Sequence, residues 1–362
     1  MNDQYHMIRY IHEGPQVLEK TLRENSAGVE KLLEQIRERK ISRIILSAVG
    51  SSYTAALIAL PLFQYHCRIP TYVMSSPEIN AYGERLVDRN TLFISISRSG
   101  ERGWVVDSLQ KAVELGALGV AITAVSDSLM ASHANMALVT SEGKEITFPK
   151  TKSVITCCGL LMRLALGLAD ESDPVAIKRM KLLNECPVLL KEVIEKTEHQ
   201  VSGLVPELME HDYLMAGGTL GNFGVALEFG IKLQETAGIP VTCNDSGNVL
   251  HGPWGGINSQ TMVSLMATAY DHELAGKTFD LAGRMGAHRL VITEPGINLR
   301  EVTEYRIELP FTTDLLMSGL FYLVPVQLIT YYWAVAEGLN PDAPEGVQDM
   351  LNAMLPAGRK EP

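Results

Sequence analysis

RIILSAVGSS, residues 43–52, joins a short apolar run to a loop of small residues, and an apolar stretch follows from Tyr53 to Gln64. The first run predicts a buried strand and the later stretch predicts a helix. The same order returns at Asp212–Ala216, where Gly217-Gly218-Thr219 and a helix from about Gly224 to Thr236 follow. Strands that alternate with helices of about ten to fifteen residues are typical of parallel sheets built from βαβ units.

Further apolar runs extend this pattern and predict an α/β protein of two domains. The candidate strands are Tyr72–Met74, Leu92–Ile96, Gly119–Ile122, Val263–Met266 and Arg289–Ile292. Between the halves, residues 169–209 are rich in helix formers and predict a helical connection. We expect a leading helix in residues 1–40 that begins near Pro15, a first domain in residues 41–190, a second in residues 191–340 and a tail in residues 341–362.

Composition narrows the class of protein. The chain has 362 residues, 46% of them hydrophobic, and a formal charge of −11. This balance is typical of a soluble α/β protein and argues against nucleic-acid binding, which needs a basic face. Its five cysteines form no CxxC pair, which fits reduced thiols in a cytoplasmic protein and predicts no metal site. We expect no cofactor, and the N-terminus lacks the apolar core of a signal peptide.

One segment resembles a membrane span. Leu315 to Ala336 has about the length and apolar character of one, but it contains Pro325, Gln327 and Thr330. Nothing else in the sequence suggests a membrane protein. We therefore predict a central helix buried between the domains.

The first candidate site is Ser95-Ile-Ser97-Arg98-Ser99-Gly100-Glu101-Arg102, at the end of the predicted strand Leu92–Ile96 and before the predicted helix Gly103–Leu115. Hydroxyl groups and free backbone N–H groups at the start of a helix bind anions, and ligands of parallel sheets lie at the carboxyl ends of strands. The two arginines would supply the positive charge that the acidic chain lacks. A serine-rich turn with a solvated arginine is the alternative interpretation.

The second candidate is a charged stripe on the helix Val225–Thr236. Glu228, Lys232 and Glu235 are spaced i, i+4, i+7 and share one face of a helix that is otherwise nearly all apolar. A solvated ladder of charges has the same spacing. A narrow charged stripe on an apolar helix is also where burial can tune a base.

The third candidate is His251, which Gly252-Pro253 follows in a loop with few regular-structure formers. Such a histidine is fixed in position, and it suits either a structural or a catalytic role.

Together these stretches resemble the double-SIS-domain phosphosugar isomerases, above all the isomerase half of glucosamine-6-phosphate synthase, over about residues 30–350. Residues 226–235 with Ser246-Gly247 and His251-Gly-Pro253 resemble the motif ALEGALKLKE…GE..HGP, with the same distance between Glu and His. The other matches are residues 94–101 with the phosphate loop S-Q-S-G-E-T, Val49–Ser52 with the first serine loop, Lys150–Lys152 with the S-T-K turn, and Tyr322–Leu328 and Asn340–Pro344 with the central helix and tail entry.

The resemblance implies a fold and a set of roles. The fold would be two tandem SIS domains, each a flavodoxin-like three-layer sandwich with a parallel sheet flanked by helices. A phosphate would be held by Ser52, Ser97, Arg98, Ser99 and Arg102, and the sugar by Ser51, Thr151 and Lys152. Glu235 would move a proton between C1 and C2, Lys232 would steady the developing enolate charge or the base, Glu228 would hold Lys232, and His251 would help to open the sugar ring.

Several positions depart from the synthase pattern. About 40 residues precede the first strand, so we expect neither a glutaminase domain nor glutamine as the nitrogen donor. Asp349 stands where the synthase tail has a lysine that forms a Schiff base with the ketose. Arg98 replaces a glutamine, Arg102 a threonine and Asn248 a glutamate of the family.

The resemblance leaves three functional hypotheses for a protein whose ligand is a sugar phosphate. Stand-alone double-SIS proteins resemble deglycases of fructosamine 6-phosphates, whose substrate brings its own nitrogen, and this is the first hypothesis. An aldose–ketose isomerase or deaminase of an amino-sugar phosphate is the second, and a non-catalytic sensor of a sugar phosphate is the third. In related proteins a second subunit closes the sugar site, so we also expect a homodimer.

Overall fold

The computed structural model describes residues 5–101 and 103–347 and contains two parallel sheets of five strands each. The first has the order β2-β1-β3-β4-β5, and the second, β7-β6-β8-β9-β10, repeats it. The prediction of a tandem α/β architecture is thereby confirmed. The strands are β1 Arg43–Ala48, β2 Thr71–Ser75, β3 Thr91–Ile96, β4 Leu118–Thr123, β5 Met136–Val139, β6 Tyr213–Gly218, β7 Val241–Asp245, β8 Thr261–Ala267, β9 His288–Thr293 and β10 Tyr305–Glu308.

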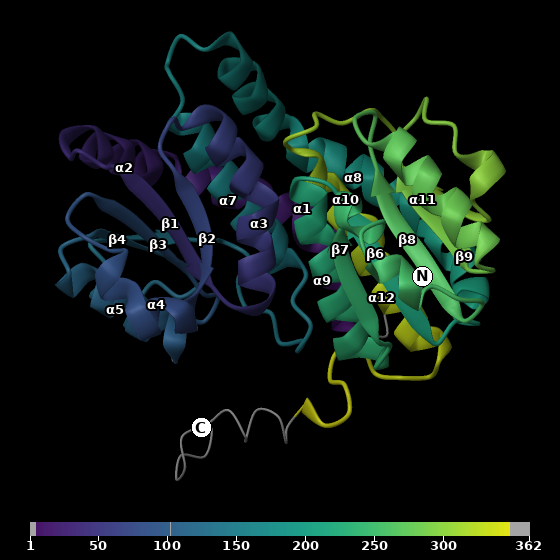
Figure 1. Cartoon of the computed structure of the whole chain (residues 1–362). Helices are drawn as coiled ribbons and strands as arrows, with labels where there is room; N and C mark the ends of the chain where they lie inside the picture. Colours follow the sequence, from purple (N-terminus) through teal and green to yellow (C-terminus); the bar gives the residue numbers. More distant parts are fainter. Residues whose placement is uncertain (1–4, 102, 348–362) are drawn as a thin grey trace.

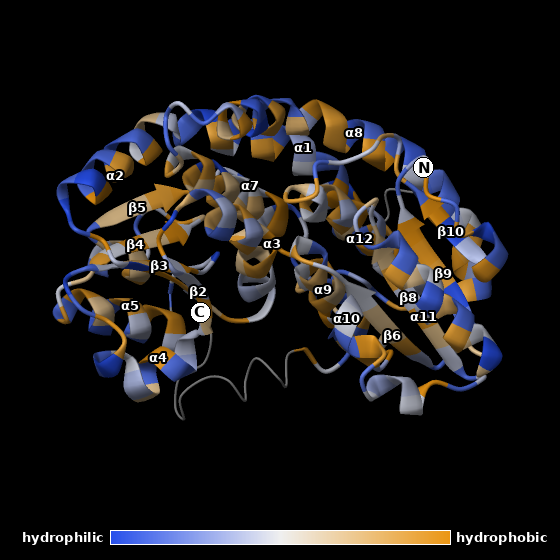
Figure 2. Ribbon diagram, turned by 45° about the horizontal axis from the view of Figure 1, so that its top comes forward, coloured by the Kyte–Doolittle hydropathy of each residue, from blue (hydrophilic) through white to orange (hydrophobic). Residues whose placement is uncertain are grey.

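Helices cover both faces of each sheet, and the two domains meet through their inner helices (Figures 1 and 2). Between the sheets lie α1 (His6–Glu24), α3 (Gly50–His66), α7 (Lys152–Gly167), α9 (Gly221–Ala237) and α12 (Ser318–Ala336). On the outer faces lie α4 (Ser76–Tyr82) and α5 (Trp104–Glu114) in the first domain and α11 (His272–Arg284) in the second. The remaining helices are α2 (Ser26–Glu38), α6 (Leu129–His133), α8 (Pro174–Leu208) and α10 (Ser246–Val249).

The N-terminal region differs from the sequence prediction. Two helices, α1 and α2, replace the single leading helix, and α1 begins at His6, so that Pro15 lies inside it. Proline in a helix interior removes a hydrogen bond. The buried side chains Met7, Ile11 and Leu18 recur along one face of α1, and their burial outweighs that loss. Helix α8 spans the boundary that we expected near residue 190.

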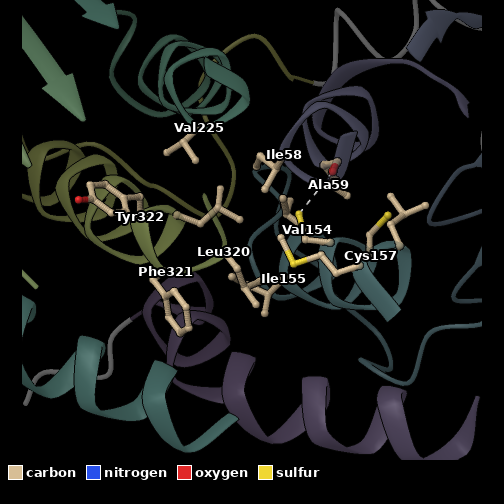
Figure 3. Close-up of a cluster of buried hydrophobic side chains, with 14 of the residues drawn as sticks. Ile58, Ala59, Val154, Ile155, Cys157, Val225, Leu320, Phe321 and Tyr322 are labelled. Atoms are coloured by element: carbon tan, nitrogen blue, oxygen red, sulfur yellow. Dashed lines mark hydrogen bonds between the residues drawn. The ribbon is translucent and has the colours of Figure 1, made fainter. Parts of the chain in front are cut away.

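One apolar core is continuous across the two domains. In Figure 3, Ile58 and Ala59 of α3, Val154, Ile155 and Cys157 of α7, Val225 of α9 and Leu320, Phe321 and Tyr322 of α12 gather at the centre. Among the described residues, α12 is the one helix long and apolar enough to cross a membrane by length and composition, and 83% of its apolar window is buried inside the protein. This burial agrees with the predicted central helix.

Helices α3 and α9 approach each other closely, and this contact joins the domains. A Cβ atom added at Gly224 would lie 2.8 Å from Ile58 Cγ1 and 2.9 Å from the backbone nitrogen of Ile58. Nearby, Thr54 Oγ1 donates a hydrogen bond to Glu228 Oε2 at 2.6 Å. The glycine thus allows the backbone of α9 to reach the helix that carries the first serine loop.

Gly224→Ala is expected to lower the free energy of unfolding by about 1–3 kcal/mol, because the added methyl group meets backbone that cannot move without separating the helices. Gly203→Ala in α8 is the matched control, since nothing lies within 4 Å of its added Cβ. That control should be neutral or stabilise by up to about 1 kcal/mol. Equal effects of the two substitutions in chemical denaturation would contradict the close contact.

Candidate active site

The site begins with two loops that leave neighbouring strands. Strands β1 and β3 pair in parallel with Ser47 opposite Ser95, so the loops after them start side by side at the carboxyl edge of the sheet. Ser51 and Ser52 lie in the first turn of α3, where the sequence had predicted a loop. Among the described residues no side chain caps this helix, so its first N–H groups can serve an anion.

The second loop is the predicted phosphate loop after β3. Ser97 Oγ accepts a hydrogen bond from the backbone N–H of Gly100 at 3.2 Å, and Ser99 is exposed. Gly100 has a positive φ of 62°, and a Cβ atom there would lie 2.5 Å from Ser128 Oγ. Both facts require glycine at this turn. Arg102, which we also predicted to bind phosphate, lies outside the described residues.

Arg98 turns its guanidinium toward the segment after β5. Its Nη2 donates to the backbone oxygen of Gly143 at 3.4 Å, and its Nε lies 3.9 Å from Glu145 Oε2. The Nε atom is buried and makes no hydrogen bond with the described residues. A partly buried guanidinium with a buried N–H that makes no such bond suits an anionic ligand.

A cavity lies beside Arg98 at the carboxyl ends of β3, β4 and β5. Its lining residues are Ser51, Ser52, Ile96, Arg98, Ile122, Thr123, Thr140, Glu142, Lys150, Ser153, Val154 and Cys157. Burial raises the pKa of Glu142, whose carboxylate accepts a hydrogen bond from Thr156 Oγ1 at 3.2 Å. Of the residues predicted from sequence, Ser51, Ser52 and Arg98 line this cavity, and Glu142 and Lys150 are additions from the structure.

Thr151 and Lys152, which we predicted to contact sugar, lie at the start of α7. Glu145 Oε1 accepts hydrogen bonds from the backbone N–H groups of Thr151 and Lys152 at 2.7 and 3.2 Å. The Lys152 ammonium instead reaches Glu13 Oε2 at 2.7 Å and lies over the ring of Tyr10. Lys152 is therefore bound to α1, while Lys150, two residues earlier, lines the cavity.

The charged stripe on α9 forms a buried triplet. Lys232 Nζ lies 2.5 Å from Glu235 Oε2 and 3.5 Å from Glu228 Oε1. The side chains of Lys232 and Glu228 are 1% and 0% exposed, whereas that of Glu235 is 23% exposed. The solvated-ladder alternative therefore does not apply to this helix. Of the three groups, Glu235 is the one with access to a ligand.

Burial and charge set the proton affinities of the triplet. Burial lowers the pKa of Lys232, but the carboxylates of Glu228 and Glu235 outweigh it and raise that pKa above its ordinary value. Burial also raises the pKa of Glu235, although the Lys232 ammonium acts in the opposite direction. Lys232 therefore stays charged, and Glu235 is a stronger proton acceptor than an exposed glutamate.

Lys150 interacts electrostatically with charged groups in both halves of the site. The pKa of Lys150 is influenced by the charges of Glu145 and Arg98 on the cavity side and by those of Lys232 and Glu235 on α9. His251 lies apart on the exposed loop after α10, and among the described residues no hydrogen bond or ion pair joins its side chain to the other predicted groups. The site thus combines, from the first domain, a sheet edge whose groups suit an anion with a carboxylate–ammonium pair from the second.

Known proteins are similar to this chain in sequence and in architecture. The family model of the SIS domain matches residues 35–167. A glutamine–fructose-6-phosphate aminotransferase (isomerizing) of Pseudomonas aeruginosa is 30% identical over 359 residues, which cover 94% of this chain and 57% of that protein. The chain therefore spans little more than half the length of this relative.

Solved structures agree with the fold. The C-terminal domain of glucosamine-fructose-6-phosphate aminotransferase from Francisella tularensis matches with a TM-score of 0.86 and 21% identity, over 95% of this chain and 99% of that one. Tagatose-6-phosphate ketose/aldose isomerase from Escherichia coli matches with a TM-score of 0.77 and 18% identity, over 98% and 97%. The chain therefore contains an SIS domain, its two parallel sheets fit two such domains, and it is homologous to the isomerase part of glutamine–fructose-6-phosphate aminotransferase.

Proposed function

We propose that this protein moves a proton between C1 and C2 of a sugar 6-phosphate, and that its reaction releases the amine of an Amadori (fructosamine-type) 6-phosphate. The observation that carries this proposal is the buried Glu228–Lys232–Glu235 triplet, with Glu235 accessible, across from an uncapped helix start that suits a phosphate. A base with a raised pKa beside a fixed ammonium suits proton abstraction next to a carbonyl. The isomerase relatives support the first part of the proposal, proton transfer on a sugar phosphate.

The proposed reaction follows from these groups. Ser52, Ser97 and Ser99 with Arg98 would hold the phosphate at the carboxyl edge of the first sheet. Glu235 would accept a proton from C1 of the open-chain ketosamine while the Lys232 ammonium stabilises the enolate oxygen that develops at C2. Return of the proton to C2 leaves an imine between C1 and the substrate nitrogen. Addition of water to that imine gives hexose 6-phosphate and the free amine.

Replacing Ser97 and Ser99 together by alanine should weaken binding of the phosphorylated substrate. Each lost hydrogen bond to a dianion is expected to cost about 1.5–3 kcal/mol of binding free energy. Calorimetry with matched phosphorylated and unphosphorylated sugars measures this effect. Ser132→Ala, which removes an exposed hydroxyl of α6, is a control. Equal affinity of the wild-type protein for the two sugars would contradict a phosphate site.

The two other hypotheses differ in product. An aldose–ketose isomerase would interconvert two sugar phosphates with no change in total free amine. A sensor would bind a panel of sugar phosphates and convert none of them. Mass spectrometry of the products of a fructosamine 6-phosphate, without added glutamine, separates the three. The accessible Glu235 favours chemistry over sensing, since a site that only binds does not need a carboxylate whose pKa is raised.

We further propose a homodimer as the minimal active unit. His251 is exposed, and in the part of the chain that the structure describes no hydrogen bond or ion pair joins its side chain to the other predicted groups, which supports a role for a second subunit in presenting it for ring opening. Light scattering should show a dimer at working concentrations. In mixtures of a Glu235→Gln and a His251→Ala variant, activity should then be regained in hybrid dimers. An active monomer would contradict this proposal.

A further inference from the structure

Lys150 lies in the candidate site, and the proposed reaction assigns it no role. Its side chain lines the cavity together with Ser52 and Arg98, and it interacts electrostatically with Glu235 and Lys232 of α9. The amine is therefore close enough to interact with groups proposed to hold the phosphate and with the group proposed to move the proton. A sugar phosphate that bridges these two sets must pass close to Lys150.

The hydrogen bonds of Lys150 suit a neutral amine. Its Nζ donates to the backbone oxygen of Glu145 at 3.2 Å and to that of Thr147. A neutral amine has two N–H donors, so the two carbonyls use both of them and the remaining tetrahedral position holds the lone pair. No carboxylate of the described residues lies within ion-pair distance of this Nζ, although Glu142 lines the same cavity.

Two other lysines of the site region, unlike Lys150, are paired with carboxylates. Lys232 is held between two carboxylates, and Lys152 is bound to Glu13. Burial lowers the pKa of Lys150 to about 8, and the charges of Arg98 and Lys232 act in the same direction while the carboxylates of Glu145 and Glu235 oppose it. At pH 7 about a tenth of the Lys150 side chains would then carry a free amine, which is the state needed for attack on a carbon centre.

We propose that Lys150 is the amine nucleophile of this site and forms an imine with C1 of the sugar phosphate. This inference rests on the proposed function. Once Glu235 has moved the proton from C1 to C2, Lys150 would attack the protonated imine at C1. The C1–N bond to the substrate amine breaks, that amine leaves with a proton, and C1 stays bound to Lys150 as an imine. Water then cleaves this imine to hexose 6-phosphate and returns the Lys150 amine.

Reductive trapping tests the proposal without relying on turnover. The wild-type protein is incubated with glucose 6-phosphate and borohydride, digested, and mapped by peptide mass spectrometry. A saturable hexose-phosphate adduct is expected on Lys150, and unphosphorylated glucose should not give it at the same concentration. Lys144→Arg is the matched control, because Lys144 is exposed and lies outside the cavity lining. It should keep the adduct, and Lys150→Arg should lose it.

A second measurement separates this inference from the proposed function. In Lys150→Arg, release of amine from a fructosamine 6-phosphate should fall at least tenfold, while Glu235-dependent exchange of the C1 proton with solvent deuterium persists. Release of amine by the wild type with no adduct, or with the adduct on another lysine, would overturn the role of Lys150 and leave the proposed function standing. A Lys150 adduct without any amine release would instead keep the nucleophile and overturn the deglycase reaction.

Discussion

Replacing Glu235 by glutamine is expected to lower turnover by about 10²–10⁴ while substrate affinity changes little, because the amide keeps the shape of the side chain and cannot accept the proton. The structure gives the physical reason. Glu235 is the accessible carboxylate of the triplet, and its carboxylate lies 2.5 Å from the Lys232 ammonium. A glutamine oxygen can still accept that hydrogen bond, so the fold should persist.

The variant is best measured by two readouts. Product formation gives the turnover, and incorporation of solvent deuterium at C1 or C2 reports the proton transfer itself. Gln234→Ala, an exposed position on the same helix, is the control and should retain both. Full activity of Glu235→Gln would show that Glu235 is structural and that the base lies elsewhere.

Replacing Lys232 by methionine is expected to lower the free energy of unfolding by about 3–5 kcal/mol near pH 7, because the buried Glu228 and the partly buried Glu235 lose the ammonium between them. The loss should be smaller at pH 5. Burial raises the pKa of Glu235, and without Lys232 that rise is no longer opposed. The folded state then binds more protons than the unfolded state, so stability falls as the pH rises from the ordinary pKa of glutamate to the folded one.

A double variant distinguishes lost charge pairing from lost packing. Lys232→Met with Glu228→Gln removes one of the unpaired carboxylates, so chemical denaturation at pH 7 should show part of the stability regained. The Thr54 hydroxyl can still donate to the amide oxygen at position 228. A loss that is independent of pH and not relieved by the second substitution would mean that Lys232 contributes packing alone.

The central parts of the fold were predictable from sequence because buried strands are continuous apolar runs. Arg43–Ala48 and the runs within β3, β4, β8 and β9 were identified in this way. The strands β5, β7 and β10 were missed. β5 and β10 are edge strands of four residues, and β7 is an edge strand whose residues Val241–Asp245 include polar ones. Edge strands are half-exposed, and short mixed segments carry little periodicity.

The parts of the candidate site that depend on strand order and helical spacing were predictable from the sequence. The loops after β1 and β3 and the stripe on α9 depend on strand order and helical spacing, both of which the sequence shows. Glu142, Glu145 and Lys150 were missed because the segment after β5 has no regular structure that would place it beside Arg98. One signal was present in the sequence, since Lys150 stands where the S-T-K turn of the family has serine.

The side-chain direction of the two lysines in that turn could not be predicted. Lys150 and Lys152 are two positions apart in the sequence. Lys150 lines the cavity, whereas Lys152 binds Glu13 of α1. The start of α7 at Lys152 and the position of α1 decide this, and α1 itself begins earlier than Pro15 suggested. Tertiary packing, which the sequence does not show locally, sets both directions.

Release of amine from an Amadori 6-phosphate is the most direct test of the proposed function. The protein is incubated with a fructosamine 6-phosphate without glutamine, and free amine and hexose 6-phosphate are quantified by mass spectrometry, with Glu235→Gln as the control. We expect equal amounts of the two products from the wild type and almost none from the variant. Interconversion of ketose and aldose phosphates with no free amine released, or no conversion of sugar phosphates that demonstrably bind, would contradict the deglycase reaction.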